Sequence, residues 1–363
     1  MKITVAMDSF KGSLTSAEAG EAVKHGILKA CPDAEVTVLP LADGGEGTLD
    51  CIAPYIKGEE VRLKVMGPLG NPVDSSYIYD HVSKTAYVEM AKASGLTLIS
   101  QEERDPYLTT TYGTGELIRE AVQRGAAKVF VFIGGSATND GGAGMLQALG
   151  ARLTDENGND INQGAIGLKG LCKTDFSGLI CKETEFIVAS DVTNPLCGPD
   201  GASFVYGPQK GASVDACREM DGWLERFAKL SGFDPFEAGT GAAGGMSFAL
   251  KNMLGADIRS GAKTVTELTG AESEIRDSDI VITGEGRMDS QTVNGKAPYG
   301  ILELGLKYGK PVYGLCGILG EGSEECLKAG FKDIRPLIVP TMVKIEAVKS
   351  VSDTAEDLIL HIM

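Results

Sequence analysis

Residues 1–30 read MKITVAMDSFKGSLTSAEAGEAVKHGILKA, and this stretch decides the fold class. Its residues 3–7 are almost all apolar, as in a strand of a parallel sheet that is buried on both faces. Thr15-Ser16-Ala17-Glu18 has the spacing of a capping box, and the apolar residues that follow it recur at helical spacing. The stretch therefore predicts a strand followed by a helix, the repeating unit of an α/β fold with a parallel sheet.

The same pattern returns at the other end of the chain. A second strand is predicted at 35–39, and strand patterns separated by helix patterns follow at 279–283, 312–316 and 334–339. Together these units predict a five-stranded doubly wound parallel sheet. The sheet does not need the intervening sequence. We therefore expect a discontinuous α/β domain formed by residues 1–60 plus 272–363, interrupted by an inserted α/β domain over residues 61–271.

The inserted domain begins with a different pattern. Apolar and polar residues alternate between residues 60 and 89, around the turn signals Gly67-Pro68 and Gly70-Asn71-Pro72, which predicts short antiparallel strands. A helix pattern at 116–124, an apolar strand at 129–133 and a glycine-rich turn at 134–144 follow. The insertion is thus expected to combine antiparallel strands with strand–helix units.

Composition excludes several classes of protein. The 50 acidic side chains outnumber the 34 basic ones, and the formal charge of −16 repels nucleic acid and anionic lipid. Apolar runs stay below the roughly 20 residues that span a bilayer, and no signal-peptide pattern follows Met1. Cysteines lack metal-ligand spacing, and the three histidines lie outside the glycine-rich segments. We expect a cytoplasmic protein with reduced cysteines, no nucleic-acid or membrane partner and no histidine-centred mechanism.

Five glycine- or acid-rich motifs follow predicted strands. Because parallel strands end at one edge of a sheet, such motifs meet at one crevice, where helix N-termini also point. In the last motif a loop is expected at 284–287, directly after the strand. The motifs are Asp8-Ser9-Phe10-Lys11-Gly12-Ser13, Ala42-Asp43-Gly44-Gly45-Glu46-Gly47, 134–142 (GGSATNDGG), Ser190-Asp191-Val192-Thr193-Asn194-Pro195 and 283–289 (TGEGRMD).

Each motif has a simpler interpretation. Glycine after a strand often serves only a tight turn. However, pairs such as Asn139-Asp140, and Asp191 with Asn194, add carboxylate and amide oxygens that suit a magnesium ion or a polyol, although Asp140 also suits helix capping. Lys11, Arg287 and Lys296 are solvated surface charges or part of an anion site. Their positions beside these motifs in an acidic chain favour the anion site.

Familiar nucleotide and hydrolase signatures do not fit. A P-loop is excluded, because Ser290 stands where its leading glycine belongs and Ala297 follows Gly295-Lys296. Residues 239–244 match G-x-G-x-x-G, but no apolar strand precedes them, which disfavours a dinucleotide site. Residues 134–138 lack the second glycine of a nucleophile elbow.

The long motifs together resemble the type-1 glycerate kinase family. The resemblance spans positions 8 to 298, and its few departures, Met288 and Ser247-Phe248, involve no group that does chemistry. It implies a flavodoxin-like α/β domain interrupted by a second α/β domain. The motifs that carry it are DSFKGSLTSAEA (8–19), PLADGGEGT (40–48), GGSATNDGGAGMLQALGA (134–151), ASDVTNPLCGP (189–199), GPQKGA (207–212), GAAGG (241–245) and TGEGRMDSQTVNGKAP (283–298).

The resemblance also implies an activity, the ATP-dependent phosphorylation of D-glycerate with Mg2+. It favours 2-phosphoglycerate as the product, and 3-phosphoglycerate stays open. Two rival functions remain at this stage: another enzyme acting on a small hydroxy acid, such as a dehydrogenase or isomerase, and a non-catalytic hydroxy-acid-binding protein. ATP and D-glycerate are the expected partners, in a monomer or a small homo-oligomer.

Phosphoryl transfer needs positioning, charge neutralisation and a group near the attacking hydroxyl. We expect Lys11 to hold phosphates, and Asp43 or Asp191 to act as base or metal ligand, with Asp140 as a further metal ligand. Arg287 is the candidate for the glycerate carboxylate, beside the substrate-binding residues Ser9, Asp289 and Lys296. The expected active site lies in the cleft between the domains. The loop residues expected to bind the nucleotide are Gly134, Gly135, Ser136, Asn139, Gly141 and Gly142.

Overall fold

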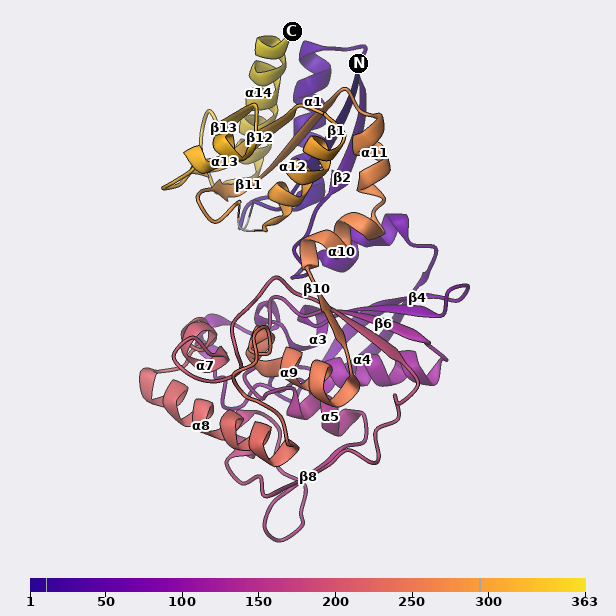
Figure 1. Cartoon of the computed structure of the whole chain (residues 1–363), viewed down its shortest axis with the longest axis vertical. Coiled ribbons are helices and arrows are strands. Elements are labelled where there is room, and N and C mark those ends of the chain that lie inside the picture. The colour runs from indigo at the N-terminus through magenta and orange to yellow at the C-terminus, as the bar shows by residue number, and fades with distance from the viewer. Residues whose placement is uncertain (11, 294) are drawn as a thin grey trace. The chain divides into compact units, whose positions relative to one another are not determined.

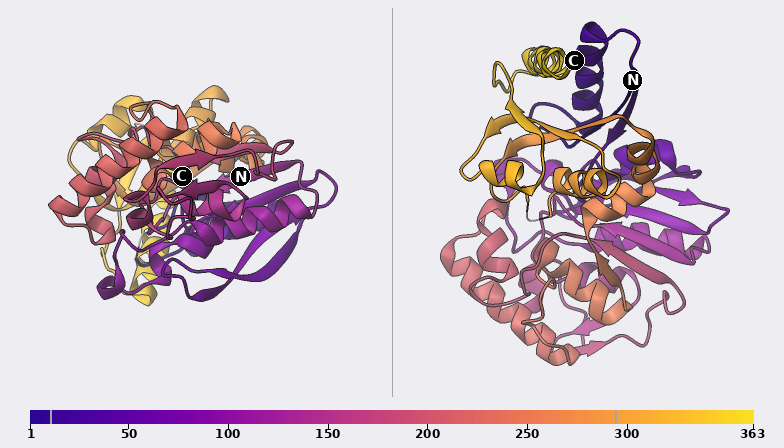
Figure 2. Two further views of the ribbon diagram at one scale, coloured as in Figure 1. Left: turned by 90° about the horizontal axis from the view of Figure 1, so that it is seen from below. Right: turned by 45° about the horizontal axis from the view of Figure 1, so that its top comes forward.

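The computed structural model describes residues 1–10, 12–293 and 295–363, and these fall into two compact units. In Figure 1 the first unit carries both the indigo start and the yellow end of the chain, which Figure 2 shows from two further directions. The first unit comprises Met1–Asp43, Asp50–Ile56 and Ala262–Met363, and the second comprises Gly44–Leu49 and Lys57–Gly261.

A parallel sheet forms the centre of the first unit. Within the described residues its strands lie in the order β13-β12-β11-β1-β2, and each is parallel to its neighbours. The chain moves outward from β1 in both directions, which is the flavodoxin-like form of a doubly wound sheet. The predicted five-stranded sheet is confirmed. Its strands are β1 (Lys2–Met7), β2 (Glu35–Pro40), β11 (Ile280–Met288), β12 (Val312–Leu319) and β13 (Asp333–Pro336).

Helices cover both faces of this sheet. Ile3 and Val5 pack in one apolar cluster with α1 and α14, whereas Ala6, which points to the opposite face, packs with α11 and α12. Burial on both faces explains why β1 is apolar along its length. The helices are α1 (Ser16–Ala30), α11 (Ala271–Asp277), α12 (Ala297–Lys307), α13 (Glu324–Ala329) and α14 (Lys344–Ile362), and the junctions between units carry α2 (Thr48–Ile52) and α10 (Gly261–Leu268).

Helix α1 begins with the predicted capping box. The Thr15 hydroxyl accepts a hydrogen bond from the Glu18 backbone N–H (3.2 Å), and the Glu18 carboxylate accepts one from the Thr15 N–H (3.0 Å). These contacts satisfy amide groups that a helix start leaves without intrahelical partners. The local sequence therefore fixes where α1 begins.

The second unit contains a mixed sheet. In the described part of the chain its order is β10-β9-β6-β5-β4-β3; β3, β4 and β5 are joined by antiparallel pairings, and the remaining pairings are parallel. The predicted antiparallel strands over 60–89 are confirmed. The strands are β3 (Glu59–Met66), β4 (Pro72–Asp80), β5 (Thr85–Glu89), β6 (Lys128–Phe132), β9 (Glu185–Ala189) and β10 (Asp257–Arg259), beside a separate pair β7 (Arg152–Thr154) and β8 (Lys173–Asp175).

One large apolar core stabilises this unit. Val129 and Val131 of β6 contribute to it, together with Leu117 of α4, Leu224 of α8 and Phe248 of α9. The helices are α3 (Ala91–Ser94), α4 (Tyr112–Gln123), α5 (Ala143–Ala148), α6 (Ala165–Leu168), α7 (Ala202–Tyr206), α8 (Val214–Ser231) and α9 (Ala242–Leu254).

The loop predicted at 284–287 is wrong. Strand β11 continues to Met288 and pairs with β12 over this stretch, with Arg287 opposite Ile318. Gly284 is needed for a close backbone approach, because a Cβ at this position would overlap the Leu315 carbonyl oxygen of β12. The sequence argument mistook a glycine that permits strand packing for a glycine that permits a turn.

Across the described residues, no helix combines the length and apolar character that crossing a membrane requires.

We expect Gly284→Ala to destabilise the protein by about 1–3 kcal/mol, the usual cost of overpacking, because the neighbouring carbonyl belongs to a paired strand and cannot easily move. Urea unfolding of the variant measures the loss. Gly300→Ala is the matched control, since a Cβ there meets no atom within 4 Å and alanine stabilises a helix interior by about 0.5–1 kcal/mol. Equal stability of the two variants would contradict the close-approach explanation.

Candidate active site

Three of the motifs meet at the carboxyl ends of β5, β6 and β9 in the second unit. The Gly134 N–H donates a hydrogen bond to the Gly44 carbonyl oxygen (3.1 Å). Side chains are excluded here, because a Cβ at Gly134 would lie 2.5 Å from the Gly45 Cα, and one at Gly44 would lie 2.8 Å from the Ala189 oxygen. The glycines thus allow the segment that follows Asp43 to pack backbone against backbone with the ends of β6 and β9.

Glu89 fixes one of these loops and was missed by the sequence analysis. It ends β5 and is almost completely buried, and its carboxylate accepts hydrogen bonds from the N–H groups of Gly47 (3.0 Å) and Leu49 (2.9 Å). An acid at the carboxyl end of an otherwise apolar strand was the available signal. Its role here is to hold the segment that follows Asp43.

Asp140 lies inside the 134–144 loop. Its fully buried carboxylate accepts hydrogen bonds from the N–H (2.9 Å) and hydroxyl (2.8 Å) of Thr111, and from the N–H groups of Gly142 (3.1 Å) and Gly144 (3.3 Å). Burial raises the pKa of this carboxyl, and the hydrogen bonds oppose that rise. These contacts make Asp140 part of the framework of the loop and argue against the expected role as a metal ligand.

A buried lysine holds the same loop from another side. Lys210 is 2% exposed, and its Nζ donates to the Ser136 hydroxyl (2.9 Å) and to the Thr138 carbonyl oxygen (2.6 Å). Burial lowers the pKa of Lys210 to about 7, and the charge of Asp140 acts in the opposite direction. Lys210 was not among the predicted site residues, although it lies in the GPQKGA motif.

The expected nucleotide-binding residues of this loop are mostly engaged within the protein. Gly141 donates its N–H to the Gly244 carbonyl oxygen (2.9 Å), and the buried Asn139 donates its amide to the Ser203 hydroxyl (2.8 Å). The N–H groups of Gly134 and Gly142 are engaged as described above, and only Gly135 is classed as exposed within 134–142. The arrangement therefore argues against a phosphate cradle formed by these amides.

Asp191 lies two residues beyond β9 and is exposed. Its Oδ1 accepts a hydrogen bond from the Gly261 N–H (3.1 Å). The neighbouring Asn194 has a structural position, because its amide accepts from the Tyr206 hydroxyl (2.7 Å) and donates to the Asp200 carbonyl oxygen (2.8 Å). Asp191 thus remains the candidate that this motif presents to solvent.

The first unit places two further predicted residues after its strands. Asp43 follows β2 and is exposed, and Ser9 follows β1 and is half-buried. The Ser9 N–H donates to the Asp8 carboxylate (2.6 Å). Lys11, the expected phosphate-binding lysine, lies outside the described residues.

A charge network at the end of β11 brings Arg287, Asp289 and Lys296 together. Arg287 Nε lies 3.1 Å from one Asp289 oxygen, and Lys296 Nζ lies 3.7 Å from the other. Lys296 Nζ also donates to Glu285 (3.2 Å), a residue that the sequence analysis quoted in its motif and assigned no role. The predicted substrate-binding residues of β11 and the start of α12 are therefore neighbours.

In this network the two cations are more exposed to solvent than the two acids. The side chains of Glu285 and Asp289 are only 10% and 13% exposed, whereas those of Lys296 and Arg287 are 35% and 57% exposed. Burial raises the pKa of the Glu285 carboxyl, and the hydrogen bond from Thr292 and the charge of Lys296 oppose that shift. Covered acids behind exposed cations suit the binding of an anionic small molecule.

The described residues include no cluster of three or more His, Cys, Asp or Glu side chains arranged for a metal. Magnesium is often held through one or two carboxylates together with substrate phosphates. The exposed carboxylates of Asp191 and Asp43 fit that mode by their chemistry, whereas the enclosed Asp140 does not.

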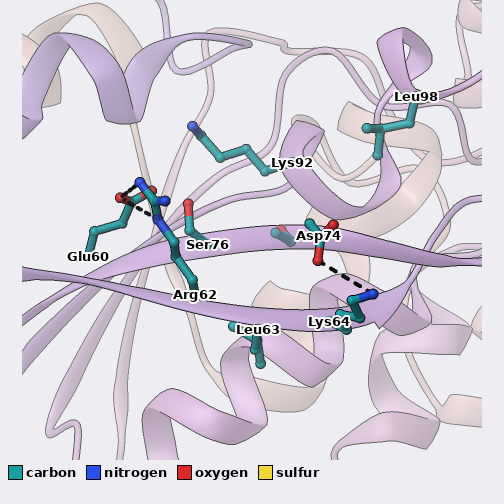
Figure 3. A pocket seen from close by; sticks show the side chains of 9 residues that line it. Glu60, Arg62, Leu63, Lys64, Asp74, Ser76, Lys92 and Leu98 are labelled. Carbon is teal, nitrogen blue, oxygen red and sulfur yellow. Dashed lines mark hydrogen bonds and ion pairs between the residues drawn. The ribbon is translucent and has the colours of Figure 1, made fainter.

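A pocket of about 770 Å³ lies in the second unit over β3 and β4, and its lining includes none of the predicted site residues. Figure 3 shows two pairs of opposite charge in its lining: Arg62 contacts Glu60 (2.6 Å), and Lys64 lies 4.0 Å from Asp74. These acids and bases pair on the exposed surface of the strands. Their mutual pairing gives no reason to place the chemistry in this pocket.

The buried Lys210 predicts a specific dependence of stability on pH. The folded protein releases this proton near pH 7, whereas an unfolded lysine keeps it until about pH 10.4. Between these values the unfolded state binds more protons, so stability should rise with pH by at most about 1.4 kcal/mol per pH unit. We expect Lys210→Met to lose this rise in urea unfolding between pH 7.5 and 9. Lys169→Met, at an exposed position, is the control and should keep the rise of stability with pH. If Lys210→Met shows the same slope as the wild type, Lys210 is not the source of that rise.

Comparison with known proteins agrees with these observations. A model of the glycerate kinase family matches residues 3–363. The chain is 48% identical to glycerate 2-kinase of Escherichia coli K12, over 88% of this chain and 86% of that protein. It is 44% identical to glycerate kinase of Bacillus subtilis 168, over 99% of this chain and 97% of that protein. The crystal structure of a protein described as a candidate glycerate kinase 2 of Salmonella typhimurium LT2 superposes with a TM-score of 0.85, at 42% identity over 100% of this chain and 98% of that one. The fold, the motifs and these similarities show that the chain is an enzyme of the glycerate kinase family.

Proposed function

We propose that this enzyme transfers the γ-phosphoryl group of ATP to the 2-hydroxyl group of D-glycerate. The observation that carries the proposal is the network at the end of β11, where Arg287 and Lys296 are more exposed than the acids Glu285 and Asp289 beside them. Glycerate is a small monoanion at neutral pH, and such a pair suits its carboxylate. The name of the Escherichia coli relative, glycerate 2-kinase, supports the choice of hydroxyl.

Arg287 is the residue that we assign to the glycerate carboxylate. A guanidinium presents parallel N–H donors that match the two oxygens of a carboxylate. Asp289 lies 3.1 Å from Arg287 Nε and would orient the guanidinium, so that its remaining donors face the substrate. Lys296 adds a second positive charge, and the Ser9 hydroxyl is a candidate to bind a glycerate hydroxyl.

In the reaction, the glycerate hydroxyl oxygen forms a bond to the γ-phosphorus of ATP while the bond to the β,γ-bridging oxygen breaks and ADP leaves. The hydroxyl proton passes to a carboxylate. The candidates for this carboxylate are Asp43 and Asp191, both of which are exposed. Asp43 or Asp191 would also serve as a ligand to magnesium, which neutralises phosphate charge when bound. Lys11 stays a prediction as a phosphate ligand.

The proposal predicts ADP release from ATP and magnesium that depends on D-glycerate, with 2-phosphoglycerate identified by ³¹P NMR. Substrate analogues separate the two hydroxyls: D-lactate retains only the 2-hydroxyl, and 3-hydroxypropanoate retains only the 3-hydroxyl. We expect measurable turnover with D-lactate and none with 3-hydroxypropanoate. Accumulation of 3-phosphoglycerate would overturn the choice of hydroxyl, and folded protein without glycerate-dependent ADP release would overturn the kinase proposal.

Asp191→Asn should lower kcat by about 100-fold or more, since general-base assistance contributes roughly that much. Raising the magnesium concentration separates the two candidate roles, because a lost metal ligand is compensated by more metal and a lost base is not. The exposed Asp215→Asn, which removes an acid paired with Arg218 in the same unit, is the control and should retain full activity. An unaltered kcat in Asp191→Asn would remove Asp191 from both roles.

A further inference from the structure

Strand β11 places Glu285 and Arg287 on the same side of the sheet. Successive strand residues alternate between faces, so that residues two apart point the same way. Strand β11 extends to Met288, and Glu285 and Arg287 pair with Cys316 and Ile318 of β12 in one register. Glu285 is the inner of the two and is covered, whereas Arg287 lies near the strand end and is exposed.

Glu285 contacts two residues that come later in the chain. One carboxylate oxygen accepts a hydrogen bond from the Thr292 hydroxyl (2.8 Å), and the other accepts one from Lys296 Nζ (3.2 Å). The Lys296–Asp289 distance is longer, at 3.7 Å. Glu285 is therefore the closer acid to the Lys296 ammonium among the residues that the structure describes.

Thr292 ties this acid to the turn that follows β11. The fully buried Thr292 hydroxyl donates to Glu285 and also accepts a hydrogen bond from the Asp289 N–H (3.1 Å). The Thr292 N–H in turn donates to the Asp289 carbonyl oxygen (3.0 Å). One buried side chain thus sets the position of the Glu285 carboxylate relative to Asp289.

The arrangement has a cost that a purely apolar packing would avoid. Burying a carboxylate is unfavourable unless it is paired and hydrogen-bonded, and a lysine side chain loses rotamer freedom when its ammonium is held. Asp289 already lies 3.7 Å from the same ammonium. Glu285 nevertheless restrains the partly exposed Lys296. This cost is explained if the position of the Lys296 ammonium matters for substrate binding.

We propose that Glu285 is a positioning residue, which holds the Lys296 ammonium where the anionic end of glycerate binds, and that Thr292 orients Glu285 for this task. The inference rests on the proposed function, since it deepens the role of Lys296 in that site. Glu285 acts through Lys296 and does not itself touch the substrate.

Glu285→Gln tests the inference with little change in shape. The amide oxygen can still accept from Thr292, but the amide nitrogen is a donor and cannot pair with an ammonium. We expect the KM for D-glycerate to rise about tenfold, as for the loss of one charged hydrogen bond, while kcat changes less, because binding in the ground and transition states weakens equally. Glu272→Gln, which removes an exposed acid paired with Lys307 in the same unit, should leave both constants unchanged.

A double-mutant cycle separates positioning from a structural role. If Glu285 acts through Lys296, Glu285→Gln should add little to the KM of Lys296→Met, because the group that it positions is gone. If the factors by which the two single substitutions raise KM multiply in the double variant, the inference is overturned. Should Glu285→Gln fail to fold, Thr292→Val supplies the same cycle, with Thr292→Ser expected to restore the wild-type KM because it keeps the hydroxyl.

A chemical readout separates failure of this inference from failure of the proposed function. Competitive acetylation followed by mass spectrometry measures how reactive the Lys296 amine is, and needs no substrate. We expect Lys296 to react several-fold faster in Glu285→Gln than in the wild type, with the other lysines as internal references. An unchanged rate would overturn the positioning role even in an active kinase. A faster rate in a protein without glycerate-dependent ADP release would instead overturn the proposed function.

Discussion

The pairing of β11 with β12 is the contact on which the candidate substrate site depends. Gly284 permits it, because a side chain there would collide with the backbone of β12, and Gly317 similarly allows close approach to Gly286. The pairing carries β11 outward to Met288, which places Glu285 and Arg287 on one face of a regular strand. Sheet pairing thus holds Glu285 and Arg287, whereas Asp289 and Lys296 belong to the segment between β11 and α12.

In the second unit, buried polar side chains fix the conformation of the loops at the strand ends. Glu89, Asp140 and Lys210 are each almost fully enclosed, and each is hydrogen-bonded to backbone groups of the loops at the carboxyl ends of the strands. Leaving such a group without partners would be costly, so these contacts favour one conformation of the loops. Many of the acid and glycine residues in these motifs therefore serve the framework, which leaves the exposed Asp191 as the candidate for chemistry.

The strands of the first sheet, the antiparallel strands over 60–89 and the strand at 129–133 were predicted well, because strand and helix periodicity and the capping box at Thr15 are local signals. No ranges were predicted for β9 and β10 of the second sheet. The prediction failed at Gly284, where a glycine needed by a neighbouring strand looked like a turn. It also could not separate Asp140 from Asp191, since both are acids in glycine-rich motifs and only the fold shows that one is enclosed. Glu285 and Lys210 were missed for the same reason: their partners are distant in sequence or lie in another element.

We place the carboxylate of glycerate at the end of β11. A crystal structure of the protein with D-glycerate tests this placement. We expect the carboxylate oxygens to lie within hydrogen-bond distance of the Arg287 guanidinium, with the Lys296 ammonium beside them and still paired with Glu285. D-glycerate bound instead at the carboxyl ends of β6 and β9, with Arg287 and Lys296 contacting only protein or solvent, would contradict it.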